Sequence, residues 1–126
     1  MMATPLKVLV VDDEPDIVEI LTYNLKKENY QVFAAYNGEE AIQSAGVNHP
    51  DLIIMDIRMP GISGIEACRI IKHDDKVKDI PVLFLTADSD EYTTMNAIDA
   101  GGDHFITKPI RPSLLIGMIK ELVQKA

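Results

Sequence analysis

Residues 7–13 read KVLVVDD, a short apolar run that ends in two aspartates, and an amphipathic stretch begins soon after it at Pro15. The run is too short for a helix but matches the usual length of a buried strand. Proline is favoured in the first turn of a helix, and Ile17, Leu21 and Leu25 then recur at helical spacing. The stretch therefore predicts a strand and then a helix, with a pair of carboxylates between them.

The same alternation of short apolar runs and amphipathic stretches continues along the chain. Strands are predicted at residues 7–11, 31–35, 51–55, 82–86 and 104–107. Helices are predicted from Pro15, over Gly38 to Ala45, around Ile65, Cys68 and Ile71, over Glu91 to Ala100, and from Pro112 with Leu115, Ile119 and Leu122 as its apolar stripe. Such alternation with right-handed crossovers predicts an α/β fold, a doubly wound five-stranded parallel sheet with helices on both faces. For its strand order we expect 2-1-3-4-5, one of the two common orders of doubly wound sheets.

Composition limits the kinds of protein that this can be. The 126 residues suit a single domain spanning residues 1–126, and 47% hydrophobic with 25% charged residues is ordinary globular usage. A net charge of −8 argues against direct binding of nucleic acid or of an anionic membrane surface, and no apolar run is long enough to span a bilayer. Cys68 is the only cysteine, which excludes an internal disulfide and a thiolate zinc site. We expect a cytoplasmic protein.

Polar side chains gather where the predicted strands end: Asp12 and Asp13, Asp56, Thr86 and Lys108. Ligands of open α/β sheets bind at the carboxyl ends of the strands, and the expected order makes the first and third strands neighbours. Three carboxylates would then share one crevice and repel one another. A hard divalent cation with oxygen ligands relieves that repulsion, so Mg²⁺ is the expected cofactor. Lys108 precedes a proline, which permits a cis peptide bond, and its ammonium can reach a phosphoryl oxygen or the carboxylate of Asp56.

Each of these residues also has a purely structural interpretation. Asp12 and Asp13 can do no more than favour the N-terminus of the first helix, where acidic side chains are stabilising. Asp56 alone can be an ordinary loop carboxylate, and Thr86 alone a strand-end hydroxyl. It is their joint placement at one edge of the sheet that favours a functional site.

Four ordered motifs carry a resemblance to a known family. They are VLVVDDE at residues 8–14, residues 51–64 with DIRMPG at 56–61, LTA at 85–87 and FITKP at 105–109. Together they resemble the receiver domain of bacterial two-component response regulators, and they span nearly the whole chain. The resemblance implies the flavodoxin-like receiver fold and a phosphoacceptor function. Asp56 would take a phosphoryl group from a sensor histidine kinase, a phosphotransfer protein or a small acyl phosphate.

The resemblance also implies roles for individual residues. Asp13, Asp56 and the backbone carbonyl of Arg58 would bind Mg²⁺ directly, and Asp12 would act through water. Thr86 and Lys108 would hold phosphoryl oxygens. In the family's switch Thr86 is coupled to an aromatic residue, and Phe105 occupies the matching place, although simple core packing is an equally good reading of Phe105.

The implied output surface is the face formed by the fourth helix, the fifth strand and the fifth helix. Candidate contacts on it are Met95, His104, Ile106 and Arg111. The partner would be a downstream protein or an output domain absent from this chain. Residues 113–120 carry one basic residue and a largely apolar stripe, unlike the charged last helix of the winged-helix transcription-factor subfamily. We therefore expect a mostly monomeric domain, with a phosphorylation-dependent dimer as the alternative.

Two other functions agree less well with these motifs. An aspartyl-phosphate phosphohydrolase typically carries a D-x-D motif on its first strand, whereas Asp56-Ile57-Arg58 lacks the second acid and lies mid-chain. A receiver-like module without phosphorylation would lack a signature residue, and all are present. We therefore expect a signalling domain rather than an enzyme, one that assists its own phosphorylation and dephosphorylation.

The sequence departs from the family pattern at a few positions. Gly101-Gly102 stands where Gly-Ala is usual, and Arg58 and Asp88 occupy two variable positions. These departures bear on the lifetime of the phosphoryl group.

Overall fold

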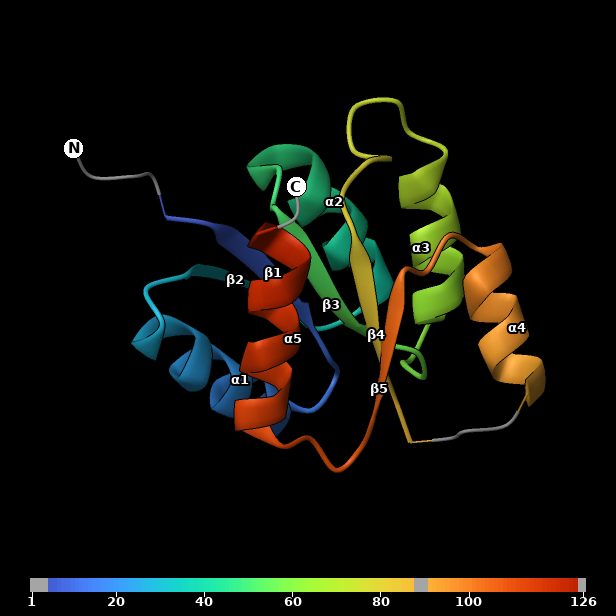
Figure 1. The fold of residues 1–126 in the computed structure, drawn as a ribbon. Coiled ribbons are helices and arrows are strands. Elements are labelled where there is room, and N and C mark those ends of the chain that lie inside the picture. Colours follow the sequence, from blue (N-terminus) through green and yellow to red (C-terminus); the bar gives the residue numbers. More distant parts are fainter. Residues whose placement is uncertain (1–4, 88–90, 125–126) are drawn as a thin grey trace.

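The computed structural model describes residues 5–87 and 91–124. Five parallel strands form one sheet in the order β2-β1-β3-β4-β5, and helices lie on both of its faces (Figure 1). The strands are β1 (Lys7–Val11), β2 (Gln31–Ala35), β3 (Leu52–Asp56), β4 (Val82–Thr86) and β5 (His104–Thr107). The helices are α1 (Pro15–Lys27), α2 (Gly38–Asn48), α3 (Gly64–Lys72), α4 (Glu91–Asp99) and α5 (Pro112–Gln124). The predicted fold class and strand order are confirmed.

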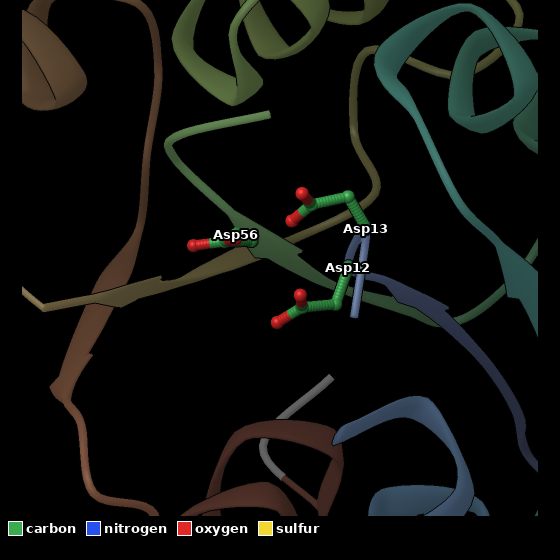
Figure 2. Close-up of side chains that lie close together, drawn as sticks. All are labelled: Asp12, Asp13 and Asp56. Atoms are coloured by element: carbon green, nitrogen blue, oxygen red, sulfur yellow. The ribbon is translucent and has the colours of Figure 1, made fainter. Parts of the chain in front are cut away.

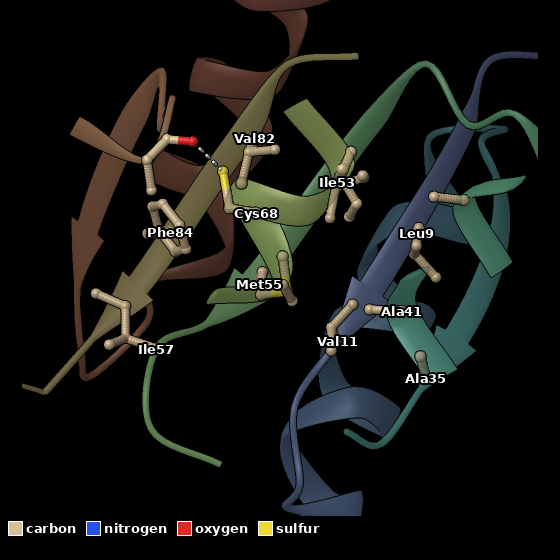
Figure 3. Close-up of a cluster of buried hydrophobic side chains, with 14 of the residues drawn as sticks. Leu9, Val11, Ala35, Ala41, Ile53, Met55, Ile57, Cys68, Val82 and Phe84 are labelled. Atoms are coloured by element: carbon tan, nitrogen blue, oxygen red, sulfur yellow. Dashed lines mark hydrogen bonds between the residues drawn. The ribbon is translucent and has the colours of Figure 1, made fainter. Parts of the chain in front are cut away.

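The sheet separates two apolar clusters, as its doubly wound topology requires. One cluster joins the sheet to α2, α3 and α4, with Phe84, Met55 and Cys68 among its buried members (Figure 3). The other joins the opposite face to α1 and α5, through Leu21 and Leu115 among others. Every residue of β3 and of β4 is buried, as expected for central strands covered on both sides. Within the described part of the chain, no helix combines the length and the apolar character that a membrane span requires.

Three elements differ in their bounds from the prediction: strand β3, helix α2, and helix α4, which ends at Asp99 rather than at Ala100. Strand β3 runs one residue later than expected, so Asp56 is the last residue of the strand rather than the first residue after it. Helix α2 continues through Gly46 to Asn48 and ends where His49 takes a left-handed conformation with φ 47°. An interior glycine weakens a helix by only about 1 kcal/mol relative to alanine and does not end it, whereas the proline after His49 forbids its continuation.

The Gly101-Gly102 departure has a packing reason. Gly101 has φ +103°, a conformation that favours glycine, and it closes the C-terminal end of α4. A Cβ built on Gly102 would lie 2.5 Å from Cε2 of Phe84 and 2.9 Å from the carbonyl oxygen of Ala97. Alanine at this position would therefore collide with the aromatic ring of β4.

The expected output face is only partly as predicted. Met95 is 64% exposed, Arg111 is exposed and His104 is half-buried. Ile106, expected as a contact, is only 8% exposed and belongs to the cluster beneath α5. The prediction that Ile106 forms part of this surface is wrong, because the side chain points toward the core that contains Leu115.

Candidate functional site

Three carboxylates meet at the carboxyl edge of the sheet. Asp12 and Asp13 directly follow β1, and Asp56 ends the neighbouring strand β3, whose Met55 pairs with Val11. One carboxylate oxygen from each of the three lies within 4.8 Å of the others, and Figure 2 shows the side chains projecting to the same side of the strand ends. Asp12 has 0% exposure and Asp56 5%, whereas Asp13 is exposed. The sheet therefore concentrates negative charge in a site that is closed at its base and open at Asp13.

Lys108 supplies a positive charge to this cluster. Its Nζ lies 3.2 Å from Oδ2 of Asp12 and 3.5 Å from Oδ1 of Asp56. The Lys108-Pro109 peptide bond is cis, and the backbone N–H of Lys108 donates to the carbonyl oxygen of Thr86 at 2.8 Å. The ammonium is thus brought from the end of β5 to carboxylates at the ends of β1 and β3.

The charges in the site shift each other's protonation. Burial and the nearby carboxylates of Asp12 and Asp13 raise the pKa of Asp56 to about 6, although Lys108 acts in the opposite direction. Burial disfavours the charged form of Lys108, but the carboxylates of Asp56 and Asp12 outweigh it and raise the pKa of this ammonium. At neutral pH the site therefore holds a cationic lysine and a mostly ionised Asp56 that an added positive charge would stabilise further.

Asp12 is held by contacts on both of its oxygens. Oδ1 accepts the backbone N–H of Glu14 at 3.0 Å, and Oδ2 contacts Lys108. Glu14, the N-cap residue of α1, makes no side-chain capping hydrogen bond. A purely structural role at the start of α1 thus explains one hydrogen bond of Asp12. The geometry shows no capping role for Asp13.

The remaining predicted residues are placed as follows. Thr86 is the last residue of β4 and is 7% exposed. The residue before it, Leu85, pairs with Asp56 of β3. Arg58 is exposed in the loop between β3 and α3. Phe105 is half-buried and stacks on Phe84 with ring centroids 5.9 Å apart, which is the core-packing arrangement. Asp88 lies outside the described residues.

Gly64 ends the motif at residues 51–64, but no role in the site was predicted for it. A Cβ at this residue, the first of α3, would overlap the carbonyl oxygen of Asp56 and lie 3.1 Å from Cα of Ile57. A glycine eight positions beyond a candidate strand-end acid was the available signal, but nothing in one sequence shows that a helix start packs back onto the strand it follows.

The donor set fits a hard divalent cation. Carboxylate oxygens from three residues converge in a partly buried site, and such oxygens are the ligands that Mg²⁺ uses in proteins, together with water and phosphate. Neither a thiol nor an imidazole belongs to this cluster, so softer metals have no preferred ligand within it.

Comparison with known proteins gives consistent matches. The sequence model of the family described as "Response regulator receiver domain" matches residues 8–120. The chain is 37% identical over 120 residues to the alkaline phosphatase synthesis transcriptional regulatory protein PhoP of Bacillus subtilis, an alignment that covers 95% of this chain and 49% of PhoP. The chain thus spans about half the length of that curated relative.

Solved structures agree with this match. The signal receiver domain of a histidine kinase from Syntrophus aciditrophicus is 35% identical with a TM-score of 0.88, over 95% of this chain and 91% of that one. The chemotaxis response regulator CheY4 of Vibrio cholerae is 28% identical with a TM-score of 0.89, over 94% of this chain and 99% of that one.

Proposed function

Since this chain belongs to the response regulator receiver domain family, we propose that Asp56 is its phosphoacceptor and that phosphorylation there requires Mg²⁺. The observation that carries the proposal is the convergence of Asp12, Asp13 and Asp56 within 4.8 Å beside the ammonium of Lys108. Receiver domains act in signalling with histidine kinases or phosphotransfer proteins as partners, and the donor to this chain is of that kind, or a small acyl phosphate.

The reaction needs a nucleophile and charge neutralisation but no general base. A carboxylate oxygen of Asp56 attacks the phosphorus, while the P–N bond of a phosphohistidine breaks and its electron pair stays on the imidazole, which takes up a proton. With acetyl phosphate the P–O bond breaks instead and acetate leaves. The pKa of about 6 leaves roughly one Asp56 in ten protonated at pH 7, so most molecules carry a ready nucleophile. Hydrolysis of the acyl phosphate by water then restores the carboxylate.

Asp13, Asp56 and the backbone carbonyl of Arg58 are the residues that would hold Mg²⁺, with Asp12 acting through water. The exposure of Asp13 and the engagement of both oxygens of Asp12 support this division. When bound, the ion neutralises the carboxylates and orients the phosphoryl oxygens. Asp56 itself then needs only to remain fixed at the end of β3.

Thr86 and Lys108 are proposed to hold the phosphoryl oxygens. The ammonium of Lys108 lies 3.5 Å from Oδ1 of Asp56, so a phosphoryl group on Asp56 can draw it away from Asp12. Movement of Thr86 toward the same group would vacate space for Phe105, whose ring now stacks on Phe84. Phosphorylation would thereby shift the population toward a second packing of the α4-β5-α5 face, which then binds a downstream protein or output domain.

A labelling experiment tests the site and the metal together. The protein is incubated with acetyl phosphate and Mg²⁺, and intact mass spectrometry measures phosphoryl addition. We expect labelling of the native chain, none of Asp56→Asn, and none of the native chain in excess chelator. Asp75→Asn is the matched control, because it makes the same chemical change at a side chain that is 94% exposed. Equal labelling of Asp56→Asn and Asp75→Asn would refute the assignment of Asp56.

A further inference from the structure

We propose that Gly64 is a positioning residue for the phosphorylation site, because only a residue without a side chain lets the start of α3 lie against the backbone of Asp56. The inference rests on the proposed function, since Asp56 is taken as the phosphoacceptor. The junction between β3 and α3 would then hold in place both the carboxylate of Asp56 and the loop that contains Arg58.

The contact is between backbones. Gly64 is buried, and its N–H donates to the carbonyl oxygen of Ile57 at 2.8 Å. A Cβ on Gly64 would overlap the carbonyl oxygen of Asp56 and lie 3.0 Å from its carbonyl carbon. Because the obstacle is backbone and not the flexible end of a side chain, it cannot be relieved by a change of rotamer.

Backbone conformation does not explain the glycine. Gly64 has no positive φ, unlike Gly61 with φ +81° and Gly101 with φ +103°. It is the first residue of α3, after Ser63, whose side chain caps the helix by accepting the N–H of Glu66 at 3.1 Å. In a helix alanine is more stable than glycine, so propensity favours the substitution that the contact forbids.

A Cβ on Gly64 would displace residues of the phosphorylation site. Helix α3 is anchored in the core by Ala67, Cys68 and Ile71, and the body of β3 is buried between β1 and β4. The remaining freedom lies at the end of β3 and in the loop that follows it. Alanine at position 64 would therefore shift the carbonyl of Asp56, and with it the carboxylate and the proposed carbonyl ligand of Arg58.

The test compares Gly64→Ala with the native chain by two measurements. Isothermal titration calorimetry gives the Kd for Mg²⁺ without phosphorylation, and acetyl phosphate titration separates the maximal labelling rate from the donor concentration at half-maximal rate. We expect the Mg²⁺ Kd to rise and the maximal rate to fall, each by about tenfold or more, because misplacement by roughly 1 Å can reduce rates about a hundredfold.

Ile71→Val separates positioning from lost stability. It deletes a buried methyl group on the same helix, where the side chain is 1% exposed, and is expected to destabilise the fold while leaving Mg²⁺ affinity and labelling unchanged. The double variant Gly46→Ala, Gly117→Ala is a more stable protein in which Gly64→Ala can be tested again. A Cβ at either of these two glycines meets nothing within 4 Å.

Every outcome decides the proposal. The proposal would be overturned by a Gly64→Ala protein that binds Mg²⁺ as tightly as the native chain and is labelled at the same rate. It would also be overturned by a Gly64→Ala protein that fails to fold even in the background with alanine at positions 46 and 117, because Gly64 would then be required for folding rather than for placement. Failure of the native chain itself to be labelled would instead refute the proposed function, so the two failures are distinguishable.

Discussion

The ammonium of Lys108 lies 3.2 Å from Oδ2 of Asp12, a carboxylate with no exposed surface. The two residues are 96 positions apart, and the contact joins the end of β5 to the end of β1, past β4 and β3 in the sheet order. Breaking a buried ion pair by removing one partner leaves an uncompensated charge. Lys108 is therefore the counter-charge of the acidic cluster as well as a proposed ligand of the phosphoryl group.

Removing Lys108 should have opposite effects on fold stability and metal affinity. Lys108→Ala is expected to lower the free energy of unfolding by about 1–3 kcal/mol in chelator, since the buried carboxylates of Asp12 and Asp56 lose their partner. The same change should tighten Mg²⁺ binding, because a competing cation has left the site. Urea denaturation and calorimetry measure the two quantities.

The control for this variant is Lys78→Ala, whose ion pair with Asp75 is mostly exposed. It is expected to change stability by less than about 1 kcal/mol and to leave the Mg²⁺ affinity unaltered. Weaker Mg²⁺ binding by Lys108→Ala would contradict the view that its ammonium competes with the metal.

Asp56 should make metal-free stability depend on pH. Its folded-state pKa is raised from 3.8 to about 6, so the folded chain holds a proton that the unfolded chain releases. The sign follows from linkage: stability is lost as the pH rises from about 4 to about 6 and stays lost above that. Two pKa units correspond to about 3 kcal/mol, and relaxation of the site reduces the expected loss to about 1–2 kcal/mol.

Asp56→Asn should remove this dependence. In chelator at about pH 7.5 the variant is expected to be more stable than the native chain by about 1–2 kcal/mol, and near pH 4 the two should converge. Saturating Mg²⁺ should reverse the order, because it binds the native chain more tightly. Chemical denaturation over this pH range is the measurement, and a native chain at least as stable as Asp56→Asn in chelator at neutral pH would disprove the reasoning.

Regular alternation made the strands predictable, and the order expected of a five-stranded doubly wound sheet was correct. The contacts within the site, by contrast, depended on geometry that no period encodes. Parallel strand ends share an edge, which was enough to gather Asp12 and Asp56 from a single sequence. Lys108 lies nearer to Asp12 than to Asp56, and this difference depends on where the chain turns after β5. Ile106 was misplaced because both sides of the short strand β5 carry apolar residues, so alternation did not reveal which side faces the core.

Gly102 and Phe84 should be coupled in stability. Gly102→Ala is expected to destabilise the chain by about 1–3 kcal/mol, since its Cβ would meet the ring of Phe84 and the carbonyl of Ala97. In a Phe84→Leu background the same change should cost less, because the smaller side chain leaves room. A double-mutant cycle by urea denaturation gives the coupling energy, and strict additivity of the two changes would show that the ring is not the obstacle.

The last prediction concerns assembly through the α4-β5-α5 face. Tyr92, Met95 and Ile98 on α4 and Leu114 on α5 are all more than half exposed, at 77%, 64%, 54% and 58%. An apolar surface of this kind favours a protein partner over the charged pairing of the winged-helix subfamily. We expect the isolated domain to remain mostly monomeric when beryllofluoride, an acyl-phosphate mimic, occupies Asp56.

Light scattering with Mg²⁺, with and without beryllofluoride, measures the mass of the domain in both states. Met95→Glu is the matched variant, because it places a charge on the exposed side of α4 without touching the carboxylates. A dimer that forms only in the activated native sample, and that Met95→Glu abolishes, would show that a second copy of this chain is the partner. Such a result would overturn the expectation of a monomer while leaving the phosphoacceptor assignment intact, since that assignment rests on Asp12, Asp13, Asp56 and Lys108 and not on the exposed residues of α4 and α5.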